Sequence, residues 1–336
     1  MLTCQLRRDN AAVAVAADPA TIVGVAAECA PWIIADYGAT ALTRAWTIST
    51  GPGSRPAGGG WLPVPTTPPG PGEPRRCLKV NAGQRLIALQ AGPGPWAVRF
   101  TLRLVRALIR RQQHAEGEMF LHAGAVIVGG AGIAVAAPQR SGKTTTLLAL
   151  LEHATVTGTP AAFVSNDDLS IRSAGGVVTG HGWPRGVEIR RDMLPSLGGI
   201  GARLAAAESA AGATPGSLHL RPSRLAQLAG SVLASSTPLR LLVFPRFARP
   251  GEPAHLRRLP AARAIRLLAT HLRRPDEAED WLDPYFTVPG QALSTAAITA
   301  LGGVPAVAAV SAAADLPATA AALTALAADP DATVLP

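Results

Sequence analysis

Apolar and polar positions along the chain predict strands that alternate with helices. In the N-terminal part, TIVGVAAE at 21–28 and ALTRAWTIS at 41–49 are typical of strands. Further on, CLKVNA at 77–82 and QRLIALQ at 84–90 predict a hairpin with residues 81–83 as its turn. From Trp96 to about Gln113, apolar residues recur at helical spacing with arginines between them. We expect an amphipathic helix there, whose arginines face solvent.

The middle of the chain predicts two strands, a helix and a further strand. MFLHAGAVIVGG at 119–130 and AGIAVAAP at 131–138 form the two strands, joined by a glycine-rich turn. TTTLLALLEHA at 144–154 is typical of a helix, and AAFVSND at 161–167 of a buried strand. Later strands are expected at 239–247 and 304–312, and alanine-rich helices at 201–211, 261–273 and 316–328.

This order of elements indicates an α/β fold, with a mixed, partly parallel sheet flanked by helices. Residues 51–74 are dense in glycine and proline, which predicts a long loop or linker rather than an element. We expect a smaller α+β region at 1–50, the linker at 51–74, strands and a helix leading into the core at 75–118, and the main domain at 119–336.

The net charge of +9 makes a nucleic-acid partner worth considering. Only Lys79 and Lys143 are lysines, however, and the arginines occur as scattered pairs rather than in one block. No basic module with interleaved aromatic residues accompanies them. We therefore attribute the charge to a compositional bias and expect no nucleic-acid partner.

The three cysteines, Cys4, Cys29 and Cys77, lie far apart and form no C-x-x-C pair. This spacing disfavours a disulfide framework or a zinc site, so a cytoplasmic location is expected. The apolar run from 11 to 32 is interrupted by charged residues and prolines, which argues against a membrane span.

The segment APQRSGKT at 137–144 nearly matches the phosphate-loop pattern G-x-x-x-x-G-K-[ST]. An apolar strand precedes it and an apolar-faced helix follows, which is the context that such a loop requires. Lys143 is expected to reach the β- and γ-phosphates, and Thr144 to coordinate Mg²⁺. The expected nucleotide-binding residues are Gln139, Arg140, Ser141, Gly142, Lys143, Thr144 and Thr145.

Ala137 stands where the pattern has its first glycine. If that position needs a positive φ, alanine costs about 1 kcal/mol relative to glycine. Such a cost does not exclude nucleotide binding.

Asp167 and Asp168 follow directly after the strand that comes next in the chain. A nucleotide enzyme needs carboxylates at such a position, to hold the metal and to manage the attacking group. Their closeness to Lys143, and the lack of an L-S-G-G-Q element, disfavour a transport-type ATPase.

The motifs FLHAGAVIVGGAGIAVAAPQRSGKTTTLLALL, FVSNDDLSI and GVEIRRDML together resemble the catalytic domain of the HPr kinase/phosphorylase family. The resemblance covers about residues 119–195. A weaker likeness to short peptide-modifying kinases continues toward the C-terminus. The resemblance to the HPr kinase/phosphorylase family implies a P-loop kinase-like catalytic domain within 119–336.

The resemblance also implies roles for individual residues. Asp167 accepts the proton of a substrate hydroxyl and Asp168 helps to hold Mg²⁺, although adjacent carboxylates can exchange these roles. His122 stabilises the base or the transferred phosphoryl group. Arg190 offsets developing charge, and Glu188 orients Arg190 or contacts a second metal ion. Arg185 and Arg191 lie in the same arginine-rich stretch and are alternatives to Arg190.

The resulting hypothesis is an ATP- and Mg²⁺-dependent kinase that phosphorylates a hydroxyl of a peptide, a protein or a small molecule. The acceptor is unidentified, and a homo-oligomer is possible. The residues after Arg190 depart from the family pattern, which lowers the expectation of a carrier-protein substrate and of the reverse reaction. The alternatives are a nucleotide-binding regulator that transfers nothing and a nucleic-acid-associated NTPase.

Overall fold

A computed structural model of the chain describes residues 1–38, 45–51, 59–64, 73–92, 94–209, 216–286 and 295–332. The chain divides into two compact units. Unit 1 comprises residues 1–118 and 274–290, and unit 2 comprises residues 119–273 and 291–336. Residues 274–286, which the sequence analysis assigned to the main domain, thus pack with the N-terminal part of the chain.

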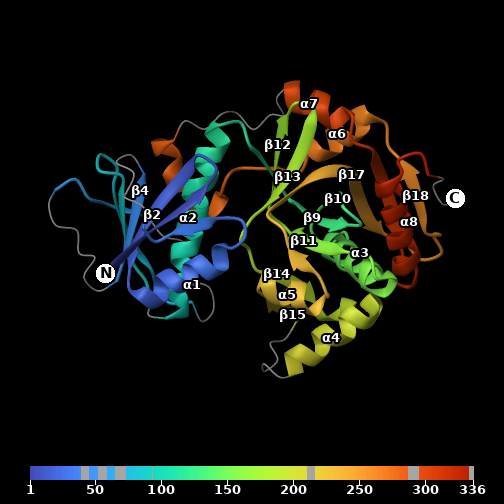
Figure 1. Ribbon diagram of the computed structural model, residues 1–336, viewed down its shortest axis with the longest axis horizontal. Helices are drawn as coiled ribbons and strands as arrows, with labels where there is room; N and C mark the ends of the chain where they lie inside the picture. The colour runs from blue at the N-terminus through green and yellow to red at the C-terminus, as the bar shows by residue number, and fades with distance from the viewer. Residues whose placement is uncertain are drawn as a thin grey trace. The chain divides into compact units, whose positions relative to one another are not determined.

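Unit 1 contains a seven-stranded mixed sheet with two helices packed against it (Figure 1). The strand order is β3-β1-β2-β4-β7-β6-β5, and the β2–β4 and β4–β7 pairs are parallel. The elements are β1 (Leu2–Arg8), β2 (Ala11–Ala17), α1 (Pro19–Cys29), β3 (Ile34–Asp36), β4 (Trp46–Thr50), β5 (Leu62–Val64), β6 (Cys77–Asn81), β7 (Leu86–Gln90), α2 (Pro95–Ala115) and the 3₁₀ segment η2 (Glu277–Tyr285). The β6–β7 hairpin and helix α2 confirm the predictions for these segments.

The predicted strand at 21–28 is wrong, because this segment belongs to helix α1. Asp18 caps the helix by accepting a 2.9 Å hydrogen bond from the backbone N–H of Thr21, and Pro19 occupies the first turn. Ile22, Val25 and Cys29 then share the buried face at helical spacing. The Asp-Pro pair was the sequence signal for a helix start.

The predicted linker at 51–74 contains one strand, β5, which pairs with β6 at the edge of the sheet. Pro63 is compatible with this position, because an edge strand leaves one row of N–H groups unpaired. Residues 52–58 and 65–72 of the predicted linker, and residues 41–44 of the strand expected at 41–49, lie outside the described residues.

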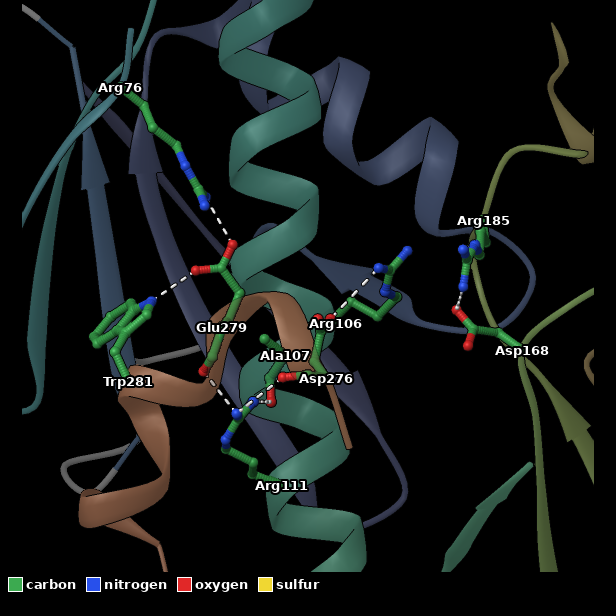
Figure 2. A network of polar contacts seen from close by, with 9 residues as sticks. All are labelled: Arg76, Arg106, Ala107, Arg111, Asp168, Arg185, Asp276, Glu279 and Trp281. Atoms are coloured by element: carbon green, nitrogen blue, oxygen red, sulfur yellow. Dashed lines mark hydrogen bonds and ion pairs between the residues drawn. The ribbon is translucent and has the colours of Figure 1, made fainter. Parts of the chain in front are cut away.

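The arginines of helix α2 do not all face solvent as expected. Arg111 is only 1% exposed, because the η2 segment covers it. Its guanidinium donates to the carbonyls of Asp276 and Glu279 (Figure 2). It also donates to the Asp283 carboxylate at 2.8 Å. Glu279 also forms a buried 2.7 Å ion pair with Arg76. Within unit 1, these contacts hold η2 against helix α2 and Arg76.

Unit 2 is built on an eleven-stranded mixed sheet, which confirms the α/β class (Figure 1). Its strands are β8 (Met119–Leu121), β9 (Ala123–Val128), β10 (Ala131–Ala136), β11 (Ala161–Ser165), β12 (Leu169–Ala174), β13 (Val177–Gly182), β16 (Val232–Leu233), β17 (Ser236–Phe247), β18 (His255–Arg258), β19 (Leu272–Arg273) and β20 (Ala306–Ser311). A separate two-stranded sheet joins β14 (Val187–Arg190) to β15 (Ser217–Leu220).

Strand β17 links the part of this sheet that contains β13, β12, β8 and β19 to the part that contains β10, β9, β11 and β20. Its first residues pair antiparallel with β13, and its later residues pair parallel with β10 and β20. The helices are α3 (Lys143–Thr157), η1 (Arg191–Leu197), α4 (Gly198–Ser209), α5 (Pro222–Leu228), α6 (Ala261–Ala269), α7 (Thr295–Gly302), η3 (Ala313–Asp315) and α8 (Leu316–Ala328).

Two apolar cores lie on opposite faces of the unit 2 sheet. One core joins the sheet to α3, α4, α5 and α8, and the other joins it to α6 and α7. The unit therefore has three layers, with the sheet in the middle.

Two predicted elements of unit 2 have different boundaries in the structure. The strand expected at 119–130 is interrupted at His122: β8 pairs with β12, whereas β9 pairs with β10 and β11. The helix expected at 261–273 ends at Ala269, and residues 272–273 form β19 instead. In both cases the backbone leaves the predicted element to satisfy hydrogen bonds in a neighbouring strand.

In the part of the chain that the structure describes, no helix combines the length and apolar character needed to cross a membrane.

Gly124 lets the chain after β11 lie directly on β9. A Cβ at this position would collide with the backbone oxygen of Asn166, and would lie 2.6 Å from the backbone oxygen of Ser165 and from a Leu147 methyl group. We expect Gly124→Ala to lower the free energy of unfolding by about 2–3 kcal/mol, because backbone has little room to move. Urea unfolding measures this. Gly302→Ala, where nothing lies within 4 Å of the added Cβ, is the control. Equal stability of the two variants would contradict the prediction.

Candidate functional site

The loop between β10 and α3 holds the predicted phosphate-loop residues. Arg140 and Gly142 have positive φ values of 66° and 96°, whereas Ala137 does not. Ala137 therefore carries no strain from its missing glycine. Two features favour glycine at position 142. Its φ is positive, and a Cβ there would lie 3.3 Å from the ring of Phe247.

Helix α3 begins at Lys143, immediately after this loop. The Thr146 hydroxyl donates to the Gly142 carbonyl at 2.9 Å, and the backbone N–H of Thr146 reaches the same oxygen at 2.8 Å. The other N–H groups at the start of the helix lie at the positive end of its dipole. Such an end binds anions, and phosphate above all.

The Lys143 side chain is only 6% exposed and contacts two groups from other strands. Its Nζ lies 2.6 Å from Asp167 Oδ1 and 2.8 Å from His122 Nε2. Asp167 comes from the turn after β11, and His122 from the junction of β8 and β9. The fold thus brings together three residues that the sequence analysis singled out.

Burial and neighbouring charge decide the protonation of this group. The pKa of His122 is lowered to about 4, first by burial and then by the Lys143 charge. Burial also lowers the pKa of Lys143, while Asp167 opposes that change. His122 is therefore neutral near pH 7, and its Nε2 accepts a hydrogen bond from the ammonium group of Lys143.

Asp168 is buried and forms a 3.3 Å ion pair with Arg185 (Figure 2). Its backbone carbonyl accepts a hydrogen bond from the Ser165 hydroxyl, which closes the turn that carries both aspartates. Arg185 follows strand β13, and about half of its side chain is exposed. Of the three arginines considered as alternatives, Arg185 forms an ion pair with a site carboxylate, whereas Arg190 pairs with Asp192.

Arg190 and Glu188 lie on the separate sheet formed by β14 and β15. Arg190 is exposed and pairs with Asp192, its neighbour in the chain, with Nε 3.1 Å from Oδ1. Glu188 is exposed, and its side chain forms no hydrogen bond or ion pair with a described residue. Neither side chain is joined to Lys143, Asp167 or Asp168 by a hydrogen bond or an ion pair.

No cluster of three or more His, Cys, Asp or Glu side chains suited to a metal ion occurs among the described residues. Thr144 and Asp168 remain the candidates for contact with Mg²⁺. This small number is compatible with Mg²⁺, which commonly takes one or two protein ligands together with water and phosphate oxygens.

Asn166 is a polar residue of the site that the sequence analysis passed over. It is 5% exposed, and neither its amide nitrogen nor its amide oxygen has a hydrogen-bond partner among the described residues. Leaving such groups unpaired costs about 1–3 kcal/mol. Its place directly before the two aspartates was the available signal.

Comparison with known proteins adds a distant likeness. No family model and no curated protein matches the chain. Among solved structures, it is similar to the HPr(Ser) kinase/phosphatase from Coxiella burnetii, with 11% sequence identity and a TM-score of 0.29. The match covers 63% of this chain and 95% of the other. A similarity at this level does not decide the function.

Removing the charge of Lys143 should raise the pKa of the His122 imidazole. In Lys143→Met we expect the imidazole pKa to rise from about 4 toward the ordinary 6.5, since Asp167 remains and favours protonation. NMR titration of the imidazole measures this. An unchanged midpoint would exclude Lys143 as a cause.

The same shift predicts the direction of a pH effect on stability. The unfolded chain protonates His122 near the ordinary value of 6.5, whereas the folded chain does so near 4. The stabilisation from neutral His122 is therefore complete above pH 6.5 and is lost as the pH falls through 4.

Proposed function

We propose that the chain is a kinase that binds ATP and Mg²⁺ and transfers the γ-phosphoryl group to a hydroxyl. The observation that carries this proposal is the contact of Lys143 with Asp167 and His122 at the start of α3. It combines a phosphate-binding loop with a carboxylate positioned to accept a proton. Phosphoryl transfer depends on such positioning and on charge stabilisation.

The loop and the helix start are assigned to the nucleotide. Residues 139–145 supply backbone N–H groups, and the buried ammonium of Lys143 supplies a charge for the phosphates. Bound Mg-ATP contributes the transferable phosphoryl group and a cation that offsets its charge. Thr144 and Asp168 are the proposed contacts of that cation.

The buried amide of Asn166 supports a polar ligand at this place. Its nitrogen and oxygen lack partners within the described chain, although the residue directly precedes Asp167. Orphaned polar groups of this kind are rare in folded proteins and call for an explanation. A ligand or an ordered water bound beside the aspartates would satisfy them.

Asp167 is the proposed base. About a quarter of its side chain is exposed, so an acceptor hydroxyl can approach it, whereas Asp168 is almost fully buried. Arg185 takes the place that the resemblance gave to Arg190, because it is tied to Asp168 beside the site. Its charge is available to offset negative charge during transfer.

The alternative is a regulator that binds nucleotide and transfers nothing. The contact between Lys143 and Asp167 favours this regulator, because a carboxylate that is paired with the lysine is not free to accept a proton from a substrate hydroxyl. Nucleotide binding must draw Lys143 toward the phosphates if Asp167 is to act. The two functions therefore differ in what happens after ATP binds.

The first test separates binding from transfer. Lys143→Ala should weaken Mg-ATP binding about tenfold or more, since it removes a charge-assisted contact with phosphate. Asp167→Asn should leave that affinity within about threefold and abolish transfer, with a loss of roughly 10²–10⁴ in rate. Calorimetry measures binding, and release of phosphate to water measures transfer before the acceptor is known.

Two arginine variants complete this experiment. Arg185→Gln should slow turnover, whereas Arg190→Gln, in which an exposed arginine away from these contacts is changed, should not. Tight Mg-ATP binding with no turnover in the wild type would favour the regulator. Transfer by Asp167→Asn at the wild-type rate would remove Asp167 as the base.

A further inference from the structure

Strand β19 and the residue directly before it carry two polar side chains, Arg273 and His271, that the proposed function does not use. Leu272 lies opposite Leu121 of β8, and Arg273 lies opposite Phe120. The pairing continues with a 2.8 Å hydrogen bond from the His122 N–H to the His271 carbonyl. The residue that contacts Lys143 is thus held directly by β19.

Strand alternation fixes the faces of these residues. Leu121 and Leu272 pack into the core beneath α6 and α7. Successive side chains of a strand point to opposite faces, so His271 and Arg273 lie on the other face of the sheet, together with His122. That face carries the contact with Lys143.

His271 is a buried side chain without a hydrogen-bonding partner for its ring. The residue is 7% exposed, and its imidazole forms no hydrogen bond or ion pair with any described residue. Burial lowers its pKa, and the nearby charges of Lys143 and Arg273 lower it further. The ring is therefore neutral and has one N–H to donate.

Arg273 is an exposed cation with no ion-pair partner among the described residues. Its charge acts on the site, because it lowers the pKa values of both His122 and Lys143. An arginine in this position raises the positive potential without a carboxylate to neutralise it. Such an arrangement attracts an oxyanion, for which guanidinium is well suited.

We propose that His271 and Arg273 form an oxyanion subsite beside Lys143, which binds a phosphate-class group. The neutral imidazole donates one hydrogen bond, and the guanidinium supplies the charge. The oxyanion has two possible sources: the terminal phosphate of the nucleotide, or an anionic group on the acceptor. The first source rests on the proposed function, and the second does not require that ATP be the nucleotide.

Binding measurements on the full chain distinguish these sources. The probes are Mg-ADP, a non-hydrolysable Mg-ATP analogue, and inorganic phosphate added to the ADP-loaded protein. The variants are Arg273→Gln, Arg273→Lys and His271→Gln. Arg257→Gln is the matched control, because Arg257 is an exposed arginine of unit 2 on β18. Circular dichroism verifies that each variant is folded.

If the nucleotide fills the subsite, Arg273→Gln should raise the dissociation constant of the ATP analogue about tenfold and leave that of ADP unchanged. If the acceptor fills it, both nucleotides should bind normally and phosphate should bind about tenfold more weakly. In either case Arg273→Lys should recover part of the loss, His271→Gln should weaken the same probe, and Arg257→Gln should stay within about twofold.

Unchanged affinities of all three probes in folded Arg273→Gln and His271→Gln would overturn the subsite. If the wild-type chain binds no nucleotide, the proposed function fails instead. Titration of the same variants with inorganic phosphate alone then decides the subsite: weaker binding than in Arg257→Gln supports it, and equal binding overturns it.

Discussion

The site depends on one buried ammonium group. Lys143 is 6% exposed at the start of α3, where the helix dipole is itself positive. A cation in this position needs partners, and Asp167 and His122 provide them from the turn after β11 and the junction of β8 and β9. The same pair of positive elements, ammonium and helix start, is suited to phosphate. The contacts that offset this buried charge thus lie at the place where the phosphates are proposed to bind.

Backbone packing brings these three residues together. The turn after β11 can lie on β9 only because residue 124 has no side chain, and the bond from His122 to His271 holds the junction of β8 and β9. The apolar cores on the two faces of the sheet fix α3 and the strands around this arrangement. The polar residues His122, His271 and Arg273 lie on the face of the sheet opposite α6 and α7.

Much of the fold followed from periodicity, and the errors have identifiable causes. Helix α1 was taken for a strand because its apolar residues outweighed the Asp18-Pro19 start signal. Arg111 was expected in solvent because its own helix gives no hint that η2, more than 160 residues later, covers it. Strand β19 was merged into the preceding helix, since two residues show no period. Each error concerns a contact with a distant part of the chain.

By itself, the sequence determined the loop before α3, its lysine and the two aspartates after the next strand, because local spacing and residue chemistry carry that information. The histidine before β9 was singled out by the family resemblance. Only the tertiary structure decided that Arg185 contacts Asp168, that Ala137 is unstrained, and that His271 and Arg273 share a face with His122. These depend on strand register and on the path of the chain between elements. A pattern read along one segment contains neither, since both are fixed by hydrogen bonds between segments far apart in sequence.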